Sequence, residues 1–197
     1  MAKNKKFIFG FDMDGVLIDH TLPKMRLAKK FGLELKPEQT PSEIFNQHLP
    51  KDIKEKIQKL LYDHPVISLS SPLMKGTKTI LAEVKKGGWP FFLISRRENK
   101  NPAIRLLKKR ELWPKYFNTR NSFFVDEPRD KEVKASELRI THYIDDQTKI
   151  LDELKSVKNK FLFDRFGVIK NESYQRIGSW AEFRRRMNLR QEKTNKK

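Results

Sequence analysis

The chain has 197 residues and a formal net charge of +18, a length that allows one domain with a buried core, or one domain with a small insertion. The absence of cysteine excludes disulfides, zinc–thiolate centres and cysteine nucleophiles. Because no signal-peptide pattern and no stretch of ~20 apolar residues is present, we expect a cytoplasmic protein without a membrane segment.

The first predicted strand ends in two carboxylates. Residues 7–11 (FIFGF) are apolar or glycine, and Asp12, Asp14 and Gly15 follow them closely. Ionised carboxylates are costly to bury without partners, so we expect this strand to deliver both acids to a ligand-facing edge. The two-residue spacing points both side chains the same way, and the glycine permits a sharp turn. A calcium loop would need a third acid where this chain has Val16.

Residues 19–69 show no strand pattern and are expected to form a small helical cap inserted after the first strand. Apolar residues at helical spacing cover 22–31 and 51–61. Thr40 and Glu43 form a capping-box pattern, with proline at the first helical position, which predicts another helix start.

From residue 70 onward, short apolar runs alternate with helical patterns. The expected strands are 89–94, 122–125, 141–144 and 160–163, and the expected helices lie within 75–88, 101–110, 130–139, 148–157 and 179–187. Asn101 is the expected N-cap of the helix at 101–110, and Ser179 with Glu182 forms a capping box in the last helix. The alternation predicts an α/β fold, a Rossmann-like parallel sheet with helices on both faces, built from residues 1–18 and 70–187.

The end of the chain, residues 188–197, is expected to be a disordered basic tail. Residues 184–197 include seven basic residues and one acid. Such tails are usually solvated, and contact with nucleic acid is the alternative that we keep open.

A second acidic pair, Asp145 and Asp146, follows the expected strand at 141–144. Ligands of open parallel sheets bind beyond the carboxyl ends of the strands, so the two pairs are expected to converge. Four converging carboxylates would repel one another without a cation, and oxygen ligands suit Mg²⁺. The alternative for either residue is an N-cap of the helix that begins near Thr148. The four histidines lack the spacing of a metal site. His20 is expected at the surface, and contact with substrate is the alternative, because it follows the first motif.

Three further signals fit phosphate binding. Ser95 follows the expected strand at 89–94 and is followed by Arg96 and Arg97, and a hydroxyl and guanidinium groups at a strand end suit phosphate oxygens. Of these, Ser95 and Arg96 are the predicted phosphate-binding residues. Lys131 and Lys134 lie near the start of the helix before the second acidic pair, and either could be the phosphate lysine. A serine at a strand end is more often only a cap. These signals therefore support phosphate binding mainly through their order along the chain.

That order resembles the haloacid dehalogenase (HAD) superfamily of phosphohydrolases. The motifs FDMDGVLID, FLISRR, a lysine and YIDD follow one another, and the pattern covers about residues 7–187. The resemblance implies a phosphatase in which Asp12 is the nucleophile that forms an aspartyl-phosphate, and Asp14 is the general acid and then the general base. Ser95 and Lys131 would bind the phosphoryl oxygens. The implied ligands of Mg²⁺ are Asp12, the main-chain carbonyl of Asp14, and Asp145, with Asp146 close by.

The position of the cap resembles the family's 5'-nucleotidases and deoxyribonucleotidases, which makes a nucleotide the first choice of substrate. Phe45 and Tyr62 are the aromatic candidates for base stacking, although such residues more often form the core of a cap. A phosphatase acting on nucleic-acid ends is one alternative, suggested by the basic tail. A non-catalytic nucleic-acid-binding protein is another, but such a protein has no need of Asp14.

Overall fold

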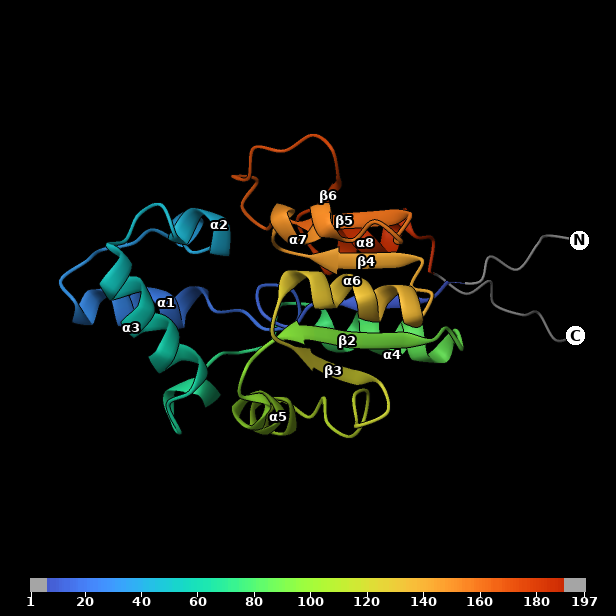
Figure 1. The fold of residues 1–197 in the computed structure, drawn as a ribbon, viewed down its shortest axis with the longest axis horizontal. Helices are drawn as coiled ribbons and strands as arrows, with labels where there is room; N and C mark the ends of the chain where they lie inside the picture. Colours follow the sequence, from blue (N-terminus) through green and yellow to red (C-terminus); the bar gives the residue numbers. More distant parts are fainter. Residues whose placement is uncertain (1–6, 190–197) are drawn as a thin grey trace, which may run out of the picture.

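A parallel sheet of six strands lies at the centre of the computed structural model, which describes residues 7–189 (Figure 1). Its strand order is β3-β2-β1-β4-β5-β6, and every neighbouring pair is parallel. The strands are β1 (Phe9–Phe11), β2 (Phe91–Arg96), β3 (Ser122–Val125), β4 (His142–Asp145), β5 (Asn159–Phe163) and β6 (Gln175–Ile177). The edge strand β6 was not predicted, because its three residues, QRI, contain only one apolar side chain.

Helices cover both faces of the sheet, which confirms the predicted α/β fold (Figure 1). They are α4 (Thr77–Lys86), α5 (Lys100–Lys109), α6 (Pro128–Glu137), α7 (Thr148–Glu153) and α8 (Trp180–Arg186). Buried residues of α4, α5 and α8 pack with Phe9 and Phe11, whereas those of α6 and α7 pack with Tyr143 and Leu162. Strands that are covered on both faces have apolar residues along most of their length, which is the pattern of the predicted strands in the sequence. Within residues 7–189, no helix has the length and apolar character needed to cross a bilayer.

Five helical elements between β1 and α4 form the cap. They are α1 (Thr21–Lys30), the 3-10 turn η1 (Pro37–Gln39), α2 (Ser42–Phe45), α3 (Lys51–Tyr62) and the 3-10 turn η2 (Ile67–Leu69). The cap has a hydrophobic core of its own, separate from the two sheet clusters, which includes Leu27, Phe45, Ile57 and Leu61. In Figure 1 the cap lies at the side toward which the strand arrows point. It therefore faces the carboxyl ends of the strands.

Two predicted helix boundaries in the core were wrong. The N-cap of α5 is Asn99, whose side chain accepts a hydrogen bond from the N–H of Asn101. The predicted cap, Asn101, is therefore already inside the helix. Helix α7 ends at Glu153 rather than near residue 157, because the chain must turn before β5 begins at Asn159. At α8 the predicted N-cap, Ser179, is confirmed, since its hydroxyl accepts the N–H of Glu182. The capping box is only half formed, because the Glu182 carboxylate accepts the N–H of Gly178 rather than that of Ser179.

The capping box predicted at Thr40 and Glu43 is not formed. The N-cap of α2 is Pro41, and the Thr40 hydroxyl donates to the carbonyl of Pro37 at 2.6 Å instead. Glu43 is free to reach across to the core, where it contacts Thr148. A residue pattern typical of a local cap therefore serves a contact between cap and core.

Candidate active site

The first acidic pair lies at the carboxyl end of β1, where the chain makes a tight turn. The Asp12 N–H donates to the carbonyl of Ile144 on β4 at 3.0 Å, and the Asp14 N–H donates to Asp12 Oδ2 at 3.0 Å. Gly15 has φ = 79°, in the left-handed region that favours glycine. A Cβ at this position would lie 2.2 Å from Asp146 Oδ2. The turn therefore needs glycine for its conformation and for the close approach of the second acidic pair.

Lys131 on α6 joins the two acidic pairs. Its side chain is buried, and Nζ lies 2.6 Å from Asp12 Oδ1 and 2.9 Å from Asp145 Oδ2. Burial alone lowers the pKa of a lysine, but the two carboxylates outweigh it and hold the pKa of Lys131 well above its usual value. Lys134 pairs with Glu137 on its own helix. Of the two candidate lysines, the structure brings Lys131 to the acids.

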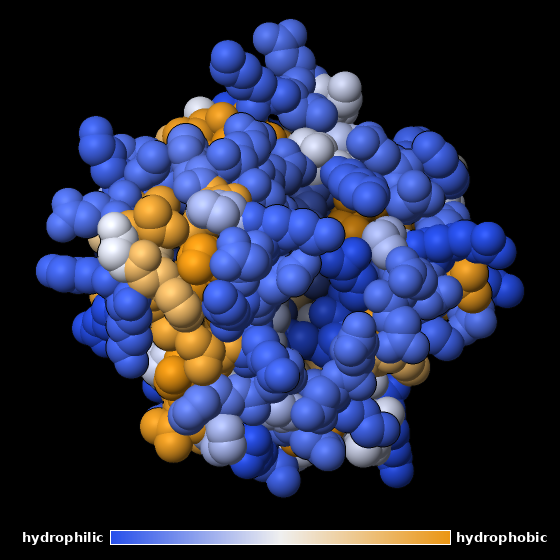
Figure 2. Space-filling view, turned by 60° about the vertical axis from the view of Figure 1, so that its left-hand side comes forward, coloured by the Kyte–Doolittle hydropathy of each residue, from blue (hydrophilic) through white to orange (hydrophobic). Residues whose placement is uncertain are grey.

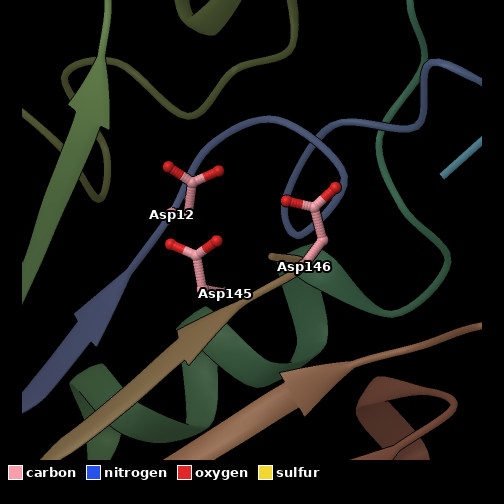
Figure 3. A group of neighbouring side chains, drawn as sticks. All are labelled: Asp12, Asp145 and Asp146. Carbon is pink, nitrogen blue, oxygen red and sulfur yellow. The ribbon is translucent and has the colours of Figure 1, made fainter. Parts of the chain in front are cut away.

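Three carboxylates are arranged as a metal site. Oxygen atoms of Asp12, Asp145 and Asp146 all lie within 4.8 Å of one another, and the three residues are buried (Figure 3). Asp146 Oδ2 accepts a hydrogen bond from Ser42 Oγ at 3.0 Å, whereas its Oδ1 is buried with no partner among the described residues. A buried carboxylate oxygen without a partner is costly, and a hard cation would satisfy it. The donor set, all carboxylate oxygens, fits Mg²⁺.

The helix-cap alternative for the second acidic pair is not what the structure shows. The N-cap of α7 is Gln147, which makes no side-chain capping bond. Asp145 Oδ1 accepts the Gln147 N–H at 3.1 Å, which orients this carboxylate at the end of β4. Asp145 and Asp146 therefore remain available to a metal.

Burial shifts the protonation of this cluster. Burial raises the pKa of Asp146 to about 7, and the charge of Asp12 adds to the effect. Burial also raises the pKa of Asp12 and Asp145, although the ammonium group of Lys131 opposes the shift. Carboxyl groups that hold protons near neutral pH compete with a metal, so metal binding is expected to release protons.

Asp14 has different partners from Asp12. Arg97 Nε donates to Asp14 Oδ2 at 2.9 Å and Arg97 Nη2 donates to Oδ1 at 2.6 Å. His20 Nε2 lies 2.5 Å from the same Oδ1, and His20 Nδ1 lies 2.6 Å from Ser71 Oγ. Burial raises the pKa of Asp14, but Arg97 and His20 outweigh it and hold the pKa well below its usual range. The environments therefore push the pKa values of Asp12 and Asp14 in opposite directions.

Ser95 lies near the end of β2, the strand that pairs directly with β1. Its hydroxyl is buried and has no hydrogen-bond partner among the described residues. A buried hydroxyl without a partner is ready to bind a ligand oxygen. Arg96 follows it, but this residue is exposed and contributes to the wall of a neighbouring cleft.

The cap closes over this edge of the sheet through two groups of contacts. From α2, Ser42 bonds to Asp146, and the Glu43 carboxylate accepts bonds from the N–H and the hydroxyl of Thr148. From α3, the ring of Tyr62 lies 4.1 Å from the guanidinium carbon of Arg97. The cap therefore touches both the carboxylate cluster and Arg97, the partner of Asp14.

A cleft of about 820 Å³ opens beside Arg97, between α3 and the loops that follow β2 and β3. Its walls are mainly polar and include Glu55, Gln58, Tyr62 and Asp126. Figure 2, in which the cap side comes forward, shows a hollow lined by hydrophilic residues and a hydrophobic band along one side of the face. A substrate larger than its phosphoryl group has room in this cleft.

Comparison with known proteins identifies solved structures with a similar fold, but no relative by sequence. No family model matches the chain, and no curated protein sequence matches it. Among solved structures, a HAD family hydrolase from Deinococcus radiodurans with bound phosphate and sodium has a TM-score of 0.63 at 16% identity, over 94% of this chain and 98% of that one. A "predicted phosphatase" from Clostridium acetobutylicum has a TM-score of 0.65 at 14% identity, over 93% and 98%. A dehalogenase has a TM-score of 0.59 at 14% identity, over 93% and 97%. The chain has the HAD-like hydrolase fold.

Two residues beside Asp14 were not among the predicted site residues: Arg97, which follows Ser95 and Arg96, and His20, which follows the first motif. Side chains alternate in an extended chain, so Arg97 shares a side with Ser95 while Arg96 faces away. That alternation would have favoured Arg97 as the residue directed at the site. The prediction that His20 lies at the surface was wrong, because only 4% of it is exposed. His20 is buried between Asp14 and the segment that returns from the cap to the core.

Proposed function

We propose that this protein is an Mg²⁺-dependent phosphomonoester hydrolase that acts through an aspartyl-phosphate on Asp12. The convergence of Lys131 with the carboxylates of Asp12, Asp145 and Asp146 carries the proposal. Phosphoryl transfer needs positioning and neutralisation of charge, and this cluster supplies both. The HAD-like fold and the phosphate bound to the similar hydrolase from D. radiodurans support it.

In the proposed reaction, a carboxylate oxygen of Asp12 attacks phosphorus while the bond from phosphorus to the leaving oxygen breaks. The leaving oxygen takes a proton from Asp14. Water then attacks the aspartyl-phosphate, gives a proton back to Asp14, and releases Asp12 and phosphate. Lys131 and the Ser95 hydroxyl hold the phosphoryl oxygens, and the exposed Arg96 remains a further candidate. When bound by Asp12, Asp145, Asp146 and the carbonyl of Asp14, Mg²⁺ neutralises phosphoryl charge.

Asp14 has to exchange partners before it can act as an acid. Both of its oxygens accept bonds from Arg97, and one also contacts His20. A carboxylate held in this way stays ionised, so we propose that substrate binding draws Arg97 away from Asp14. Tyr62, which lies against Arg97, links this exchange to the position of the cap.

A nucleotide is the first substrate class to test, and segment 19–69 is the proposed cap that selects it. The cleft of about 820 Å³ beside Arg97 has room for a nucleoside, and Tyr62 provides an aromatic ring at its edge. Phosphate release from a panel of phosphomonoesters, including 5'-nucleotides, tests this choice.

The Asp12→Asn variant tests the mechanism. Loss of the nucleophile should lower turnover by ~10³-fold or more, because the covalent step itself is removed. Excess chelator should abolish wild-type turnover, and added Mg²⁺ should restore it. The exposed Asp52, which pairs with Lys56 on α3, supplies the matched control Asp52→Asn, expected to keep full activity. Wild-type turnover in Asp12→Asn, or in excess chelator, would refute the proposal.

A phosphatase of nucleic-acid ends is the second candidate, favoured by the net charge of +18 and the basic tail. The tail beyond Leu189 lies outside the described residues. Leu189 is buried in the core, so truncation after Leu189 removes the tail alone and should leave turnover of small substrates unchanged. If the tail binds nucleic acid, truncation should also reduce the log–log salt dependence of oligonucleotide binding by ~0.7 for each phosphate that the tail neutralises. Oligonucleotide turnover that exceeds nucleotide turnover and disappears with the tail would make this candidate the better one.

A further inference from the structure

His20 is the partner of Asp14 that comes from the connection between the core and the cap. It is the N-cap residue of α1, yet its side chain makes no capping bond. Its Nε2 lies 2.5 Å from Asp14 Oδ1 instead, and its Nδ1 lies 2.6 Å from Ser71 Oγ. His20 is only 4% exposed, and Ser71 is fully buried. Both nitrogens of a buried imidazole therefore have partners, and one of these partners is the proposed acid–base group.

The contact between His20 and Ser71 lies where the two connections between core and cap run side by side. The Asp19 N–H donates to the carbonyl of Pro72 at 2.9 Å, next to an antiparallel bridge. His20 and Ser71 continue this pairing toward the cap through their side chains. The edge of the Tyr62 ring packs against the imidazole, with the ring centres 5.7 Å apart. The imidazole is therefore held by both connections and by the cap.

The carboxylate of Asp14 decides which ring nitrogen of His20 carries a hydrogen. An ionised carboxylate only accepts hydrogen bonds, so Nε2 is the donor to Asp14. In a neutral imidazole, Nδ1 then has no hydrogen and accepts the hydroxyl of Ser71. The bond at one ring nitrogen sets the role of the other, so Ser71 keeps His20 in the form that donates to Asp14.

Arg97, the other partner of Asp14, is placed differently. It lines the cleft of about 820 Å³, whose walls do not include His20. Guanidinium groups bind phosphate oxygens strongly, so a substrate in this cleft competes with Asp14 for Arg97. Among the described residues, Arg97 is the one donor to Asp14 Oδ2, whereas Oδ1 contacts both Arg97 and His20. When Arg97 moves away, Oδ2 is therefore freed while Oδ1 stays held.

We propose that His20 is a positioning residue for the general acid, which holds Asp14 Oδ1 so that Oδ2 is the oxygen that exchanges the proton. The inference rests on the proposed phosphatase function. Oδ2 gives its proton to the leaving oxygen as the bond from phosphorus to that oxygen breaks, and takes a proton back from the attacking water. A carboxyl group protonated at Oδ2 keeps Oδ1 as an acceptor, so the bond from His20 persists through both steps. His20 itself exchanges no proton with the substrate.

Substrates with different leaving groups test the proposal with the full-length protein and Mg²⁺. Adenosine 5'-monophosphate and glycerol 3-phosphate release an alkoxide, which needs a proton from Asp14. 4-Nitrophenyl phosphate releases a stable phenolate, which needs little protonation. The value of kcat/KM covers the steps up to loss of the leaving group, so the later hydrolysis of the aspartyl-phosphate does not enter it. The ratio of kcat/KM for the better alkyl phosphate to that for 4-nitrophenyl phosphate therefore reports how well Asp14 acts as an acid.

Two variants separate the contact with Asp14 from the contact with Ser71. The amide nitrogen of His20→Gln reaches the place of Nε2 and keeps a donor for Asp14. The side chain of His20→Asn is shorter, so it keeps a polar group near Ser71 and loses the contact with Asp14. We expect His20→Asn to lower kcat/KM by ~10–100-fold for the alkyl phosphate and by ~3-fold or less for 4-nitrophenyl phosphate. His20→Gln should restore most of the ratio.

The control for these variants is His48→Asn. His48 is exposed in the cap, so this change should leave the ratio of the two kcat/KM values as in the wild type. A merely structural role of His20 would lower kcat/KM for both substrates alike, because a smaller folded fraction affects every substrate equally. Equal losses in His20→Asn would therefore refute the positioning role and leave the phosphatase standing.

Further outcomes separate this inference from the proposed function. If the wild type hydrolyses no phosphomonoester with Mg²⁺, the proposed function itself is wrong. If it hydrolyses only 4-nitrophenyl phosphate, Asp14 is not an effective acid, and the inference is refuted. Nitrogen-15 NMR of the wild type tests the contact without any variant, because Nε2 of His20 should carry a hydrogen. An Nε2 without a hydrogen would refute the inference even if neither variant of His20 folds.

Discussion

The side chains of Asp12 and Asp14 extend from the same turn into different surroundings. Burial raises the pKa of Asp12, Lys131 opposes this shift, and the neighbouring carboxylates add to it. Asp14 meets a guanidinium group that outweighs its burial. Two identical side chains two residues apart therefore become chemically distinct through their neighbours alone, which is what a nucleophile and an acid–base group require.

Gly15 is the residue that lets the two acidic pairs meet, and Gly15→Ala tests this. A methyl group there would collide with Asp146 Oδ2, which a Cβ would approach to 2.2 Å. We expect at least a ~10-fold loss of Mg²⁺ affinity and a loss of ~1–3 kcal/mol in the free energy of unfolding. Mg²⁺ titration and denaturant unfolding measure the two effects.

Gly32 provides the control for this prediction. It also has a positive φ, 75°, but a Cβ there would meet nothing within 4 Å. Gly32→Ala should therefore show the conformational cost without the loss of Mg²⁺ affinity. Equal Mg²⁺ affinities in the two variants would show that Gly15 is not needed for the approach of Asp146.

At the scale of elements, the short helix α2 connects the cap to the core. It has four residues and no side-chain cap, so its position depends on tertiary contacts. Its first residue, Ser42, bonds to Asp146 of the carboxylate cluster, and its second, Glu43, accepts the N–H of Thr148 at the start of α7. The carboxylate therefore caps a helix of another part of the fold.

The variant Glu43→Ala removes this connection. We expect faster hydrogen exchange at the Thr148 amide and a several-fold fall in kcat/KM, because the cap is held less firmly over the site. The cost in the free energy of unfolding should be ~1–2 kcal/mol, as for the loss of a helix cap. Glu38 is exposed in η1, so Glu38→Ala is the control. Unchanged exchange at Thr148 in Glu43→Ala would contradict the capping role.

At the scale of the whole molecule, we expect the proposed metal binding to depend on pH through the buried carboxyl groups. Burial raises the pKa of Asp146 from 3.8 to about 7, so between about pH 4 and pH 7 the folded state holds a proton that the unfolded state lacks. Without metal, the stability that this group contributes is complete below about pH 4 and is lost as pH rises toward 7. A shift of roughly three pKa units corresponds to about 4 kcal/mol. The lowered pKa of Asp14 has the opposite sign, so its contribution is present above about pH 4 and is lost at lower pH.

We therefore expect Mg²⁺ to stabilise the protein more as pH rises from 5 to 8, because the metal replaces protons on the cluster. Thermal unfolding with and without Mg²⁺, at several pH values in that range, measures the effect. Asp146→Asn should reduce the pH dependence of the Mg²⁺ effect. A stabilisation by Mg²⁺ that does not change with pH would contradict the proposed cluster.

The sequence predicted what depends on local pattern. Apolar runs alternating with helical stripes predicted five of the six strands, the coverage of both faces and the helical cap. Asp12 and Asp145 were found as candidates because strand ends of a parallel sheet meet at one edge, a rule that needs no coordinates. Lys131 lies on a helix, and it was a candidate through its place in the order of motifs that resembles the HAD superfamily. The cytoplasmic location and the role of the basic tail stay predictions.

Only the tertiary structure decided which polar side chains face one another. Arg97 and His20 reach Asp14 from segments that lie 83 and six residues away along the chain. Lys24 carries no local signal, because a lysine on a helix is usually solvated, yet it is buried against Thr40 and Phe45 of the same cap. Patterns of one chain segment determine strands, helices and their faces. The pairing and burial of charges depend on residues distant in sequence, so they follow only once the fold brings those residues together.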